Sequence, residues 1–265
     1  MRNAIRTTIV ALLIAGGAGT AVAQDDGFLR GRLFQIAREV SPEMNPLGEV
    51  RSFSPSTGDV EALSYDLEPA HCYTWIGVTA EGTGDIDLTL SSASSAVLSA
   101  DDAPDDWPVV MYCSGQAQTV TLTLTVPSAS GQVAIAAYQT DVGGADQTET
   151  YIHYFSRAYG LDGRGSGMSG GAINRVELAP NTERRVPLGL EADHCYTIVG
   201  AAGDDVPDFD ILWEDVEGNL LAVGDAPGSF PLLDFCAPEN IQSVLRFMGV
   251  QGTGQVGYQI YSLEL

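Results

Sequence analysis

The sequence predicts a mainly β protein built from two tandem antiparallel β-sandwich domains of jelly-roll-like type, each preceded by a short amphipathic helix. Three observations predict this class: a long internal repeat, a series of short segments with alternating apolar residues, and four cysteines that recur at matching positions. They divide the chain into a leader (1–23), module 1 (24–141) and module 2 (142–265).

The internal repeat has a constant offset. The tetrapeptide His-Cys-Tyr-Thr occurs at 71–74 and at 194–197, so the offset is 194 − 71 = 123. At this offset the chain matches itself without a gap from 71 to 138. The matched pairs include Asp85 with Asp208, Asp87 with Asp210, Asp102 with Asp225, Cys113 with Cys236, and Tyr138 with Tyr261. Self-similarity of this length indicates duplicated structural units, and about 115 residues suffice for a separate core.

Short strands account for most of each module. Residues 120–126 alternate Val or Leu with Thr, the period of a strand with one buried face, and 184–190 repeat the pattern. Further candidate strands are 63–67, 72–79, 86–90, 96–100, 108–112 and 132–138. Short strands separated by turns favour an antiparallel sandwich.

One amphipathic helix is expected before each set of strands. The first carries apolar residues three and four positions apart and is expected to end before Pro42: Leu29, Leu33, Ile36 and Val40. The second has the same spacing at Ile152, Phe155 and Tyr159. Asp146 and Glu149 are suitable as its capping pair, and Gly160 as its end.

Four cysteines allow three pairings, and the duplication selects Cys72–Cys113 and Cys195–Cys236. Each pair spans the same separation, 113 − 72 = 236 − 195 = 41. We expect each disulfide to hold its sandwich together. A zinc site at His71, Cys72 and Cys113 is disfavoured, because adjacent strand residues point to opposite faces.

The leader has the features of a signal peptide. Arg2 and Arg6 precede an apolar segment at 9–15, and Ala21-Val22-Ala23 is a small-residue cleavage site. The apolar segment is too short for a membrane span. We therefore expect cleavage near Ala23 and a mature chain that starts near Gln24. The protein is expected to be exported, periplasmic or extracellular, with no membrane span.

The charge excludes several function classes. The chain has 12 basic and 35 acidic residues, a net charge of −23, and none of the basic residues is Lys. Such a surface repels phosphate backbones, so we expect no nucleic-acid partner. The absence of Lys excludes lysine nucleophiles and Schiff bases.

Two segments resemble a family. GDIDLTL (84–90) and PDFDILW (207–213) are similar to the D-x-D-L-Y-L strand of the bacterial pre-peptidase C-terminal domain, and GQVAIAAY (131–138) is similar to its closing strand. The resemblance covers about 75 residues of each half and implies a secreted, non-catalytic β-sandwich. Two features depart from the family: the paired cysteines, and the lack of an attached peptidase domain.

Enzymatic motifs are present only as short matches. Residues 167–171 fit G-x-S-x-G around Ser169, and 165–170 fit G-x-G-x-x-G. The first requires a strand-to-helix elbow and the second a βαβ unit, and neither is expected in this glycine-rich segment. The histidines, His71, His153 and His194, form no H-E-x-x-H motif. We therefore expect no catalytic residues.

The leading hypothesis is a non-catalytic secreted or periplasmic binding or scaffold protein that presents loops to a glycan or protein partner. Trp107 and its equivalent Phe230 each precede Pro in a polar loop and are candidate stacking residues, although they could instead cap the core. Trp75 and Trp213 lie on strands and are expected to pack inside. The alternative is a secreted hydrolase with a site in the 161–171 glycine loop or between the modules.

Duplicated aspartates form a candidate calcium site in each module: Asp85, Asp87 and Asp102 in the first, and Asp208, Asp210 and Asp225 in the second. Asp85 and Asp87 are two apart on a strand and so share a face. Converging carboxylates suit Ca²⁺, which takes oxygen ligands. The competing interpretation is that each aspartate caps a turn. No other cofactor is expected.

Overall fold

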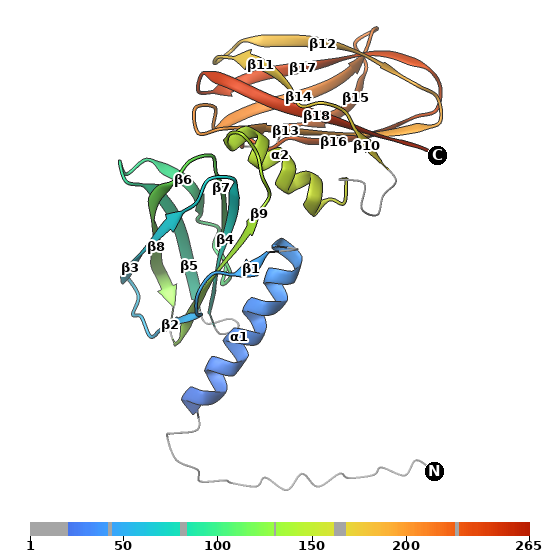
Figure 1. The fold of residues 1–265 in the computed structure, drawn as a ribbon. Coiled ribbons are helices and arrows are strands. Elements are labelled where there is room, and N and C mark those ends of the chain that lie inside the picture. The colour runs from blue at the N-terminus through green and yellow to red at the C-terminus, as the bar shows by residue number, and fades with distance from the viewer. Residues whose placement is uncertain (1–20, 42–43, 80–83, 130, 162–167, 226–227) are drawn as a thin grey trace, which may run out of the picture.

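The computed structural model describes residues 21–41, 44–79, 84–129, 131–161, 168–225 and 228–265, and shows two antiparallel β-sandwiches (Figure 1). Module 1 contains α1 (Ala21–Val40), β1 (Asn45–Pro46), β2 (Arg51–Phe53), β3 (Val60–Leu67), β4 (His71–Thr79), β5 (Gly84–Ser92), β6 (Val97–Asp101), β7 (Val109–Ser114), β8 (Gln118–Ala129) and β9 (Val133–Asp141). Residues 1–20 of the expected leader lie outside the described residues.

Module 2 repeats this order. It contains α2 (Gln147–Ala158), β10 (Ser169–Gly170), β11 (Asn174–Leu178), β12 (Glu183–Leu190), β13 (His194–Ala202), β14 (Asp208–Asp215), β15 (Leu220–Gly224), β16 (Leu232–Ala237), β17 (Ile241–Gln251) and β18 (Gly254–Glu264). The bounds of four strands in module 2 equal those of their counterparts in module 1 plus 123. The pairs are β3 with β12, β4 with β13, β6 with β15 and β7 with β16. The tandem fold class and its strands are confirmed.

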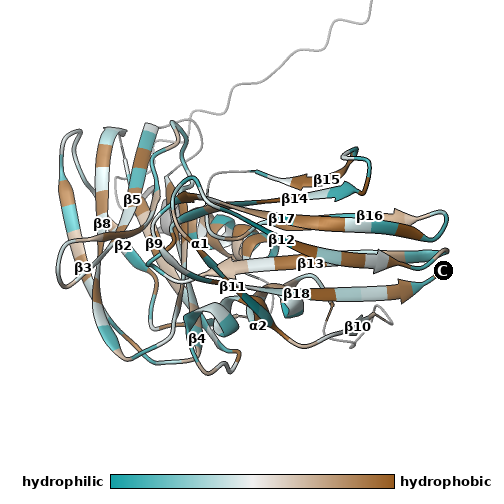
Figure 2. Ribbon diagram, turned by 90° about the horizontal axis from the view of Figure 1, so that it is seen from above, coloured by the Kyte–Doolittle hydropathy of each residue, from teal (hydrophilic) through white to brown (hydrophobic). Residues whose placement is uncertain are grey.

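Each sandwich pairs two sheets over one core. In module 1 the order is β1-β9-β4-β7 in one sheet, with β2 also on β9, and β3-β8-β5-β6 in the other. Module 2 has β10-β18-β13-β16, with β11 on β18, and β12-β17-β14-β15. Hydrophobic and hydrophilic residues alternate along strands such as β5 and β8 (Figure 2), so one face of each strand enters the core. Trp75 and Trp213 are fully buried there, as expected.

Helix α2 begins and ends where the sequence signals place its ends. Asp146 is the N-cap of α2, and its carboxylate accepts a hydrogen bond from the Glu149 amide. The Glu149 carboxylate in turn accepts one from the Ala145 amide, so the two residues form a reciprocal cap. Gly160, with φ of 68°, follows the helix. The expected stop at Pro42 lies outside the described residues, and α1 ends at Val40.

The two disulfides join the predicted cysteines, Cys72 to Cys113 and Cys195 to Cys236. Each disulfide lies within one sheet of its sandwich and not between the two sheets. In each module the bonded cysteines are register partners on neighbouring strands of one sheet, β4 with β7 and β13 with β16. They lie on the outer face, because the core-facing residues of β4 are the alternate ones, Tyr73 and Trp75.

The helices cover the outer faces of these disulfide-containing sheets. Leu29 and Leu33 of α1 pack on Ile76 of β4 and Ala134 of β9. Helix α2 packs on β13 and β18 of module 2 and also contacts β4 and β7 of module 1, so it lies between the modules (Figure 1). Neither helix of the described chain is long and apolar enough to cross a membrane.

Candidate functional site

The junction between the modules is an apolar cluster centred on α2. Tyr151 and Ile152 of α2 are buried with Cys72 and Cys113 of module 1 and Ala201 of module 2. Tyr151 lies edge-on to Tyr112, with ring centroids 6.5 Å apart. Because α2 contributes to both sides, the two sandwiches share part of their buried surface.

Polar contacts fix the same junction. The Gln147 side chain donates to the Cys113 carbonyl (3.1 Å) and to the Asp204 carboxylate (2.8 Å), and it accepts from the Asp204 amide (3.0 Å). The Tyr112 hydroxyl also donates to Asp204, at 2.8 Å. Burial and the adjacent Asp204 carboxylate raise the pKa of Tyr112, so it remains a neutral donor. Gly115 permits this approach, because a Cβ there would lie 2.5 Å from the Gln147 amide nitrogen.

A polar cleft of about 350 Å³ opens beside these contacts. Gln116 of module 1 lines it, together with Gln147, Arg175, Asp204 and Gln255 of module 2. Arg175 is paired with Asp146 at 2.8 Å and Glu149 at 2.9 Å. No sequence pattern singles out Gln147 or Asp204, because their significance depends on how two distant segments dock.

The repeated His-Cys-Tyr-Thr segments have structural roles. His71 Nδ1 lies 3.0 Å from the Pro69 carbonyl, and His194 Nδ1 lies 2.9 Å from the Ala192 carbonyl. The following tyrosines accept hydrogen bonds from backbone amides five residues upstream: Tyr73 from Glu68 at 2.7 Å and Tyr196 from Glu191 at 2.8 Å. Each tetrapeptide therefore fixes the turn that precedes its central strand.

The glycine-rich segment provides no catalytic elbow at the positions described. Ser169 and Gly170 form β10, an edge strand paired with Ser262 and Tyr261 of β18, and strand β11 rather than a helix follows. The G-x-S-x-G motif therefore lacks the strand-to-helix turn that exposes a nucleophile. Residues 162–167, which contain part of both glycine motifs, lie outside the described residues.

The predicted aspartates of each module influence one another electrostatically. Burial raises the pKa of Asp87, and the negative charges of Asp85 and Asp102 raise it further. Burial likewise raises the pKa of Asp210, with smaller effects from Asp208 and Asp225. The described side chains contain no group of three His, Cys, Asp or Glu residues arranged to hold a metal ion.

Some carboxylates in these loops cap turns. Asp208 accepts a hydrogen bond from the Gly228 amide at 3.0 Å. Asp101, which the sequence did not single out, accepts from the Val109 amide at 2.9 Å and the Ala103 amide at 3.2 Å. In contrast, one oxygen of Asp85 is buried without a hydrogen-bond partner in the described chain. Calcium binding by these clusters remains a prediction.

The two candidate stacking residues lie in different environments. Trp107 is 41% exposed, in a loop held to α1 by the ion pair of Asp106 and Arg32 at 2.7 Å. Phe230 is partly buried, and its ring centroid lies 4.2 Å from that of Tyr151 and 5.2 Å from that of Phe155. At equivalent positions of the two modules, the Trp107 ring is exposed to solvent, whereas the Phe230 ring contacts α2.

Comparison with known proteins yields no relative. No protein-family model matches the chain, and no curated protein does. Similar solved structures include the CUB1-EGF-CUB2 domains of human MASP-1/3, with 9% identity, 79% of this chain and 98% of that chain covered, and a TM-score of 0.22. The CBM22-1-CBM22-2 tandem domain of Paenibacillus barcinonensis Xyn10C has 11% identity, coverages of 84% and 94%, and a TM-score of 0.26. At these TM-scores the matches carry no argument about function.

Proposed function

We propose that the protein is an exported, non-catalytic binding or scaffold protein that presents the loops of its two modules to a glycan or protein partner. The contrast between Trp107 and Phe230 carries this proposal. In module 2 the aromatic ring at this loop position already makes a protein contact, with Tyr151 and Phe155. In module 1 the equivalent Trp107 is 41% exposed, and exposed aromatic rings are frequent anchors of binding surfaces.

The proposed absence of catalysis is supported by what the candidate catalytic residues contact. His71 and His194 each lie within hydrogen-bond distance of a turn carbonyl, and Ser169 is in an edge strand. The resemblance to the pre-peptidase C-terminal domain supports the same proposal. Export is supported by the two disulfides, which form and persist in oxidising compartments.

The experiment compares the wild-type chain with Trp107→Ala on a glycan array and against purified envelope proteins. We expect Trp107→Ala to lose binding, while Tyr159→Ala, which removes another exposed aromatic ring, retains it. The same preparations are screened for hydrolysis of polysaccharides and peptides, with Ser169→Ala as the control. Hydrolysis abolished by Ser169→Ala would overturn the proposal.

A further inference from the structure

The polar cleft at the junction is built from both modules. Gln116, in the turn between β7 and β8, lines it from module 1. Module 2 contributes Gln147 of α2, Arg175 of β11, Gln255 of β18 and Asp205 of the turn between β13 and β14. Its volume of about 350 Å³ is within the range of small-ligand sites, about 300–1,000 Å³, which occur preferentially at domain interfaces.

Several groups that line this cleft are held in place by the protein itself. The Gln147 side chain bonds both the carboxylate and the backbone amide of Asp204, and the Tyr112 hydroxyl donates to the same carboxylate. The turn that carries Gln116 is fixed as well, because the Ser114 hydroxyl donates to the Gln116 carbonyl at 2.5 Å. A ligand therefore meets groups that are already positioned, which lowers the entropy cost of binding.

Other groups in the cleft are unused. The amides of Gln116 and Gln255 and the carboxylate of Asp205 make no side-chain hydrogen bond or ion pair within the part of the chain that the structure describes. Arg175 uses only its Nη2 atom for its two ion pairs. Because an amide side chain both donates and accepts, these groups together present N–H donors and oxygen acceptors to a ligand.

The charge and polarity of the lining restrict the class of ligand. Among the described lining residues, the carboxylates of Asp146, Asp204 and Asp205 outnumber the guanidinium of Arg175, so phosphates, sulfates and acidic sugars are repelled. An apolar ligand needs apolar walls, which this cleft lacks. A cation would use the carboxylates but not the amide N–H donors, whereas a hydroxyl group both donates and accepts and so uses the two kinds of group together.

We propose that this cleft binds a neutral, hydroxyl-rich saccharide. Its hydroxyls accept hydrogen bonds from the amides of Gln116 and Gln255 and donate to the carboxylate of Asp205. The inference rests on the proposed binding function, specifies an uncharged glycan as the partner, and places a contact at the junction in addition to the one proposed for Trp107.

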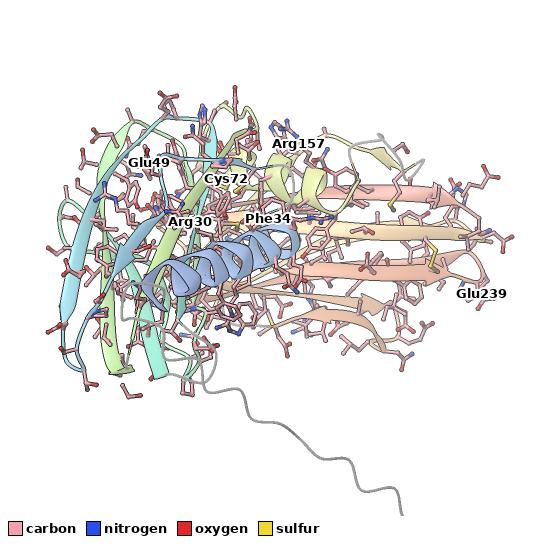
Figure 3. All side chains as sticks on the ribbon, turned by 90° about the horizontal axis from the view of Figure 1, so that it is seen from below. Arg30, Phe34, Glu49, Cys72, Arg157 and Glu239 are labelled. Atoms are coloured by element: carbon pink, nitrogen blue, oxygen red, sulfur yellow. A yellow bond between two sulfur atoms is a disulfide. The ribbon has the colours of Figure 1, made fainter. Side chains whose placement is uncertain are left out.

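The internal repeat replaces residues of this cleft at the equivalent positions. Gln116 corresponds to Glu239 (116 + 123 = 239), and Arg175 corresponds to Ser52 (175 − 123 = 52). Figure 3 shows Glu239 at the end of module 2 opposite module 1, whereas Cys72 lies at the junction. We therefore expect the junction to bind one saccharide per chain.

The test is isothermal titration calorimetry of the full chain with neutral gluco-, manno- and chito-oligosaccharides, and with oligogalacturonides as the anionic comparison. We expect a neutral oligosaccharide to bind with a Kd that changes little with salt, because binding pairs no charges. Gln116→Ala and Gln255→Ala should each weaken binding several-fold, and the double variant about tenfold or more, because each change removes a hydrogen bond to the ligand.

Gln242→Ala is the matched control, because it removes an exposed amide outside the cleft, and it should bind like the wild type. Melting curves establish that every variant is folded. Tighter binding of oligogalacturonides than of the neutral oligosaccharides, or unchanged binding in the double variant, would overturn this inference.

Two results would reject the saccharide site and leave the proposed function standing. One is glycan binding that Trp107→Ala abolishes and the double variant retains. The other is binding of an envelope protein by a chain that binds none of these oligosaccharides. A chain that binds neither glycans nor proteins would reject both proposals.

Discussion

At Ala70 and Asp193 the backbone turns with left-handed φ angles of 60° and 58°. These equivalent residues precede the two His-Cys-Tyr-Thr segments, and each donates its amide across to the neighbouring strand, to Ser114 at 2.8 Å and to Ala237 at 2.9 Å. Asp tolerates this conformation better than Ala does. The turn geometry is therefore retained in both modules, although the residue differs.

Ala70→Gly is expected to stabilise module 1. Glycine removes the Cβ conflict of a left-handed residue, about 1–2 kcal/mol, and this gain exceeds the roughly 0.5–1 kcal/mol cost of glycine's greater freedom in the unfolded chain. We expect a melting midpoint a few degrees higher by differential scanning calorimetry. Ala62→Gly, at an exposed strand position in β3, is the control and should lower the midpoint. A lower midpoint in Ala70→Gly would contradict the argument.

Asp87→Asn is expected to stabilise the calcium-free protein at neutral pH. The raised pKa of Asp87 means that the folded chain binds this proton more tightly than the unfolded chain does. The charged carboxylate therefore reduces stability at neutral pH, and the penalty disappears as the pH falls through the folded pKa. Melting in EDTA should show a higher midpoint for Asp87→Asn, and a smaller difference in acid.

Calcium gives these aspartates a separate test. If the clusters bind Ca²⁺, saturation at a hundred times the dissociation constant adds about 2.7 kcal/mol to wild-type stability, and Asp87→Asn and Asp210→Asn each lose part of this gain. Coincident wild-type melts in EDTA and in millimolar calcium would reject calcium binding and leave turn capping.

Helix α2 contacts strands of both modules. Its N-terminus is capped by Asp146, its first turn is tied to Arg175, and Gln147 links Cys113 to Asp204. A helix of this length is marginal by itself, so its stability comes from packing on both modules. The sequence predicts the helix from its periodicity and caps, but it does not show that two sandwiches share it.

Asp146→Ala is expected to destabilise the protein by about 1 kcal/mol, because it removes the N-cap of α2. Asp146→Asn is the matched control, since it keeps a capping oxygen but loses the charge that pairs with Arg175. Chemical denaturation should place Asp146→Asn between the wild type and Asp146→Ala. Equal stability of Asp146→Ala and the wild type would show that packing alone holds the helix.

At the scale of the molecule, the apolar junction couples two modules that each have their own core. Among the described residues, sixteen buried side chains form the core cluster of module 1, and a separate cluster fills module 2. Helix α2 covers the face of module 1 at Cys72 and Cys113. Removal of module 2, which includes α2, would therefore expose this face. Division of the chain is therefore asymmetric, because module 2 keeps its helix and module 1 loses its cover.

We predict that 24–141 and 142–265, expressed separately, both fold with cooperative melts, because each retains a complete core. Separation should lower the melting midpoint of 24–141 more than that of 142–265. The first fragment should also bind more of a hydrophobic dye, because Cys72 and its neighbours become exposed. Calorimetry and dye fluorescence measure both effects. If neither half folds alone, the modules are not independent units.

The sequence by itself determined the tandem architecture, the strands, the helix caps and the cysteine pairing, because a repeat at constant offset and a local period are properties of the chain alone. Only the tertiary structure decided that the disulfides bridge strands within one sheet, that Phe230 is covered while Trp107 is open, and that Gln147 meets Asp204. These outcomes depend on which faces of two sandwiches dock around α2. The way the two sandwiches pack together depends on the shapes of surfaces built from segments that are distant in sequence. The periodicity of apolar residues and the spacing of motifs therefore do not predict it.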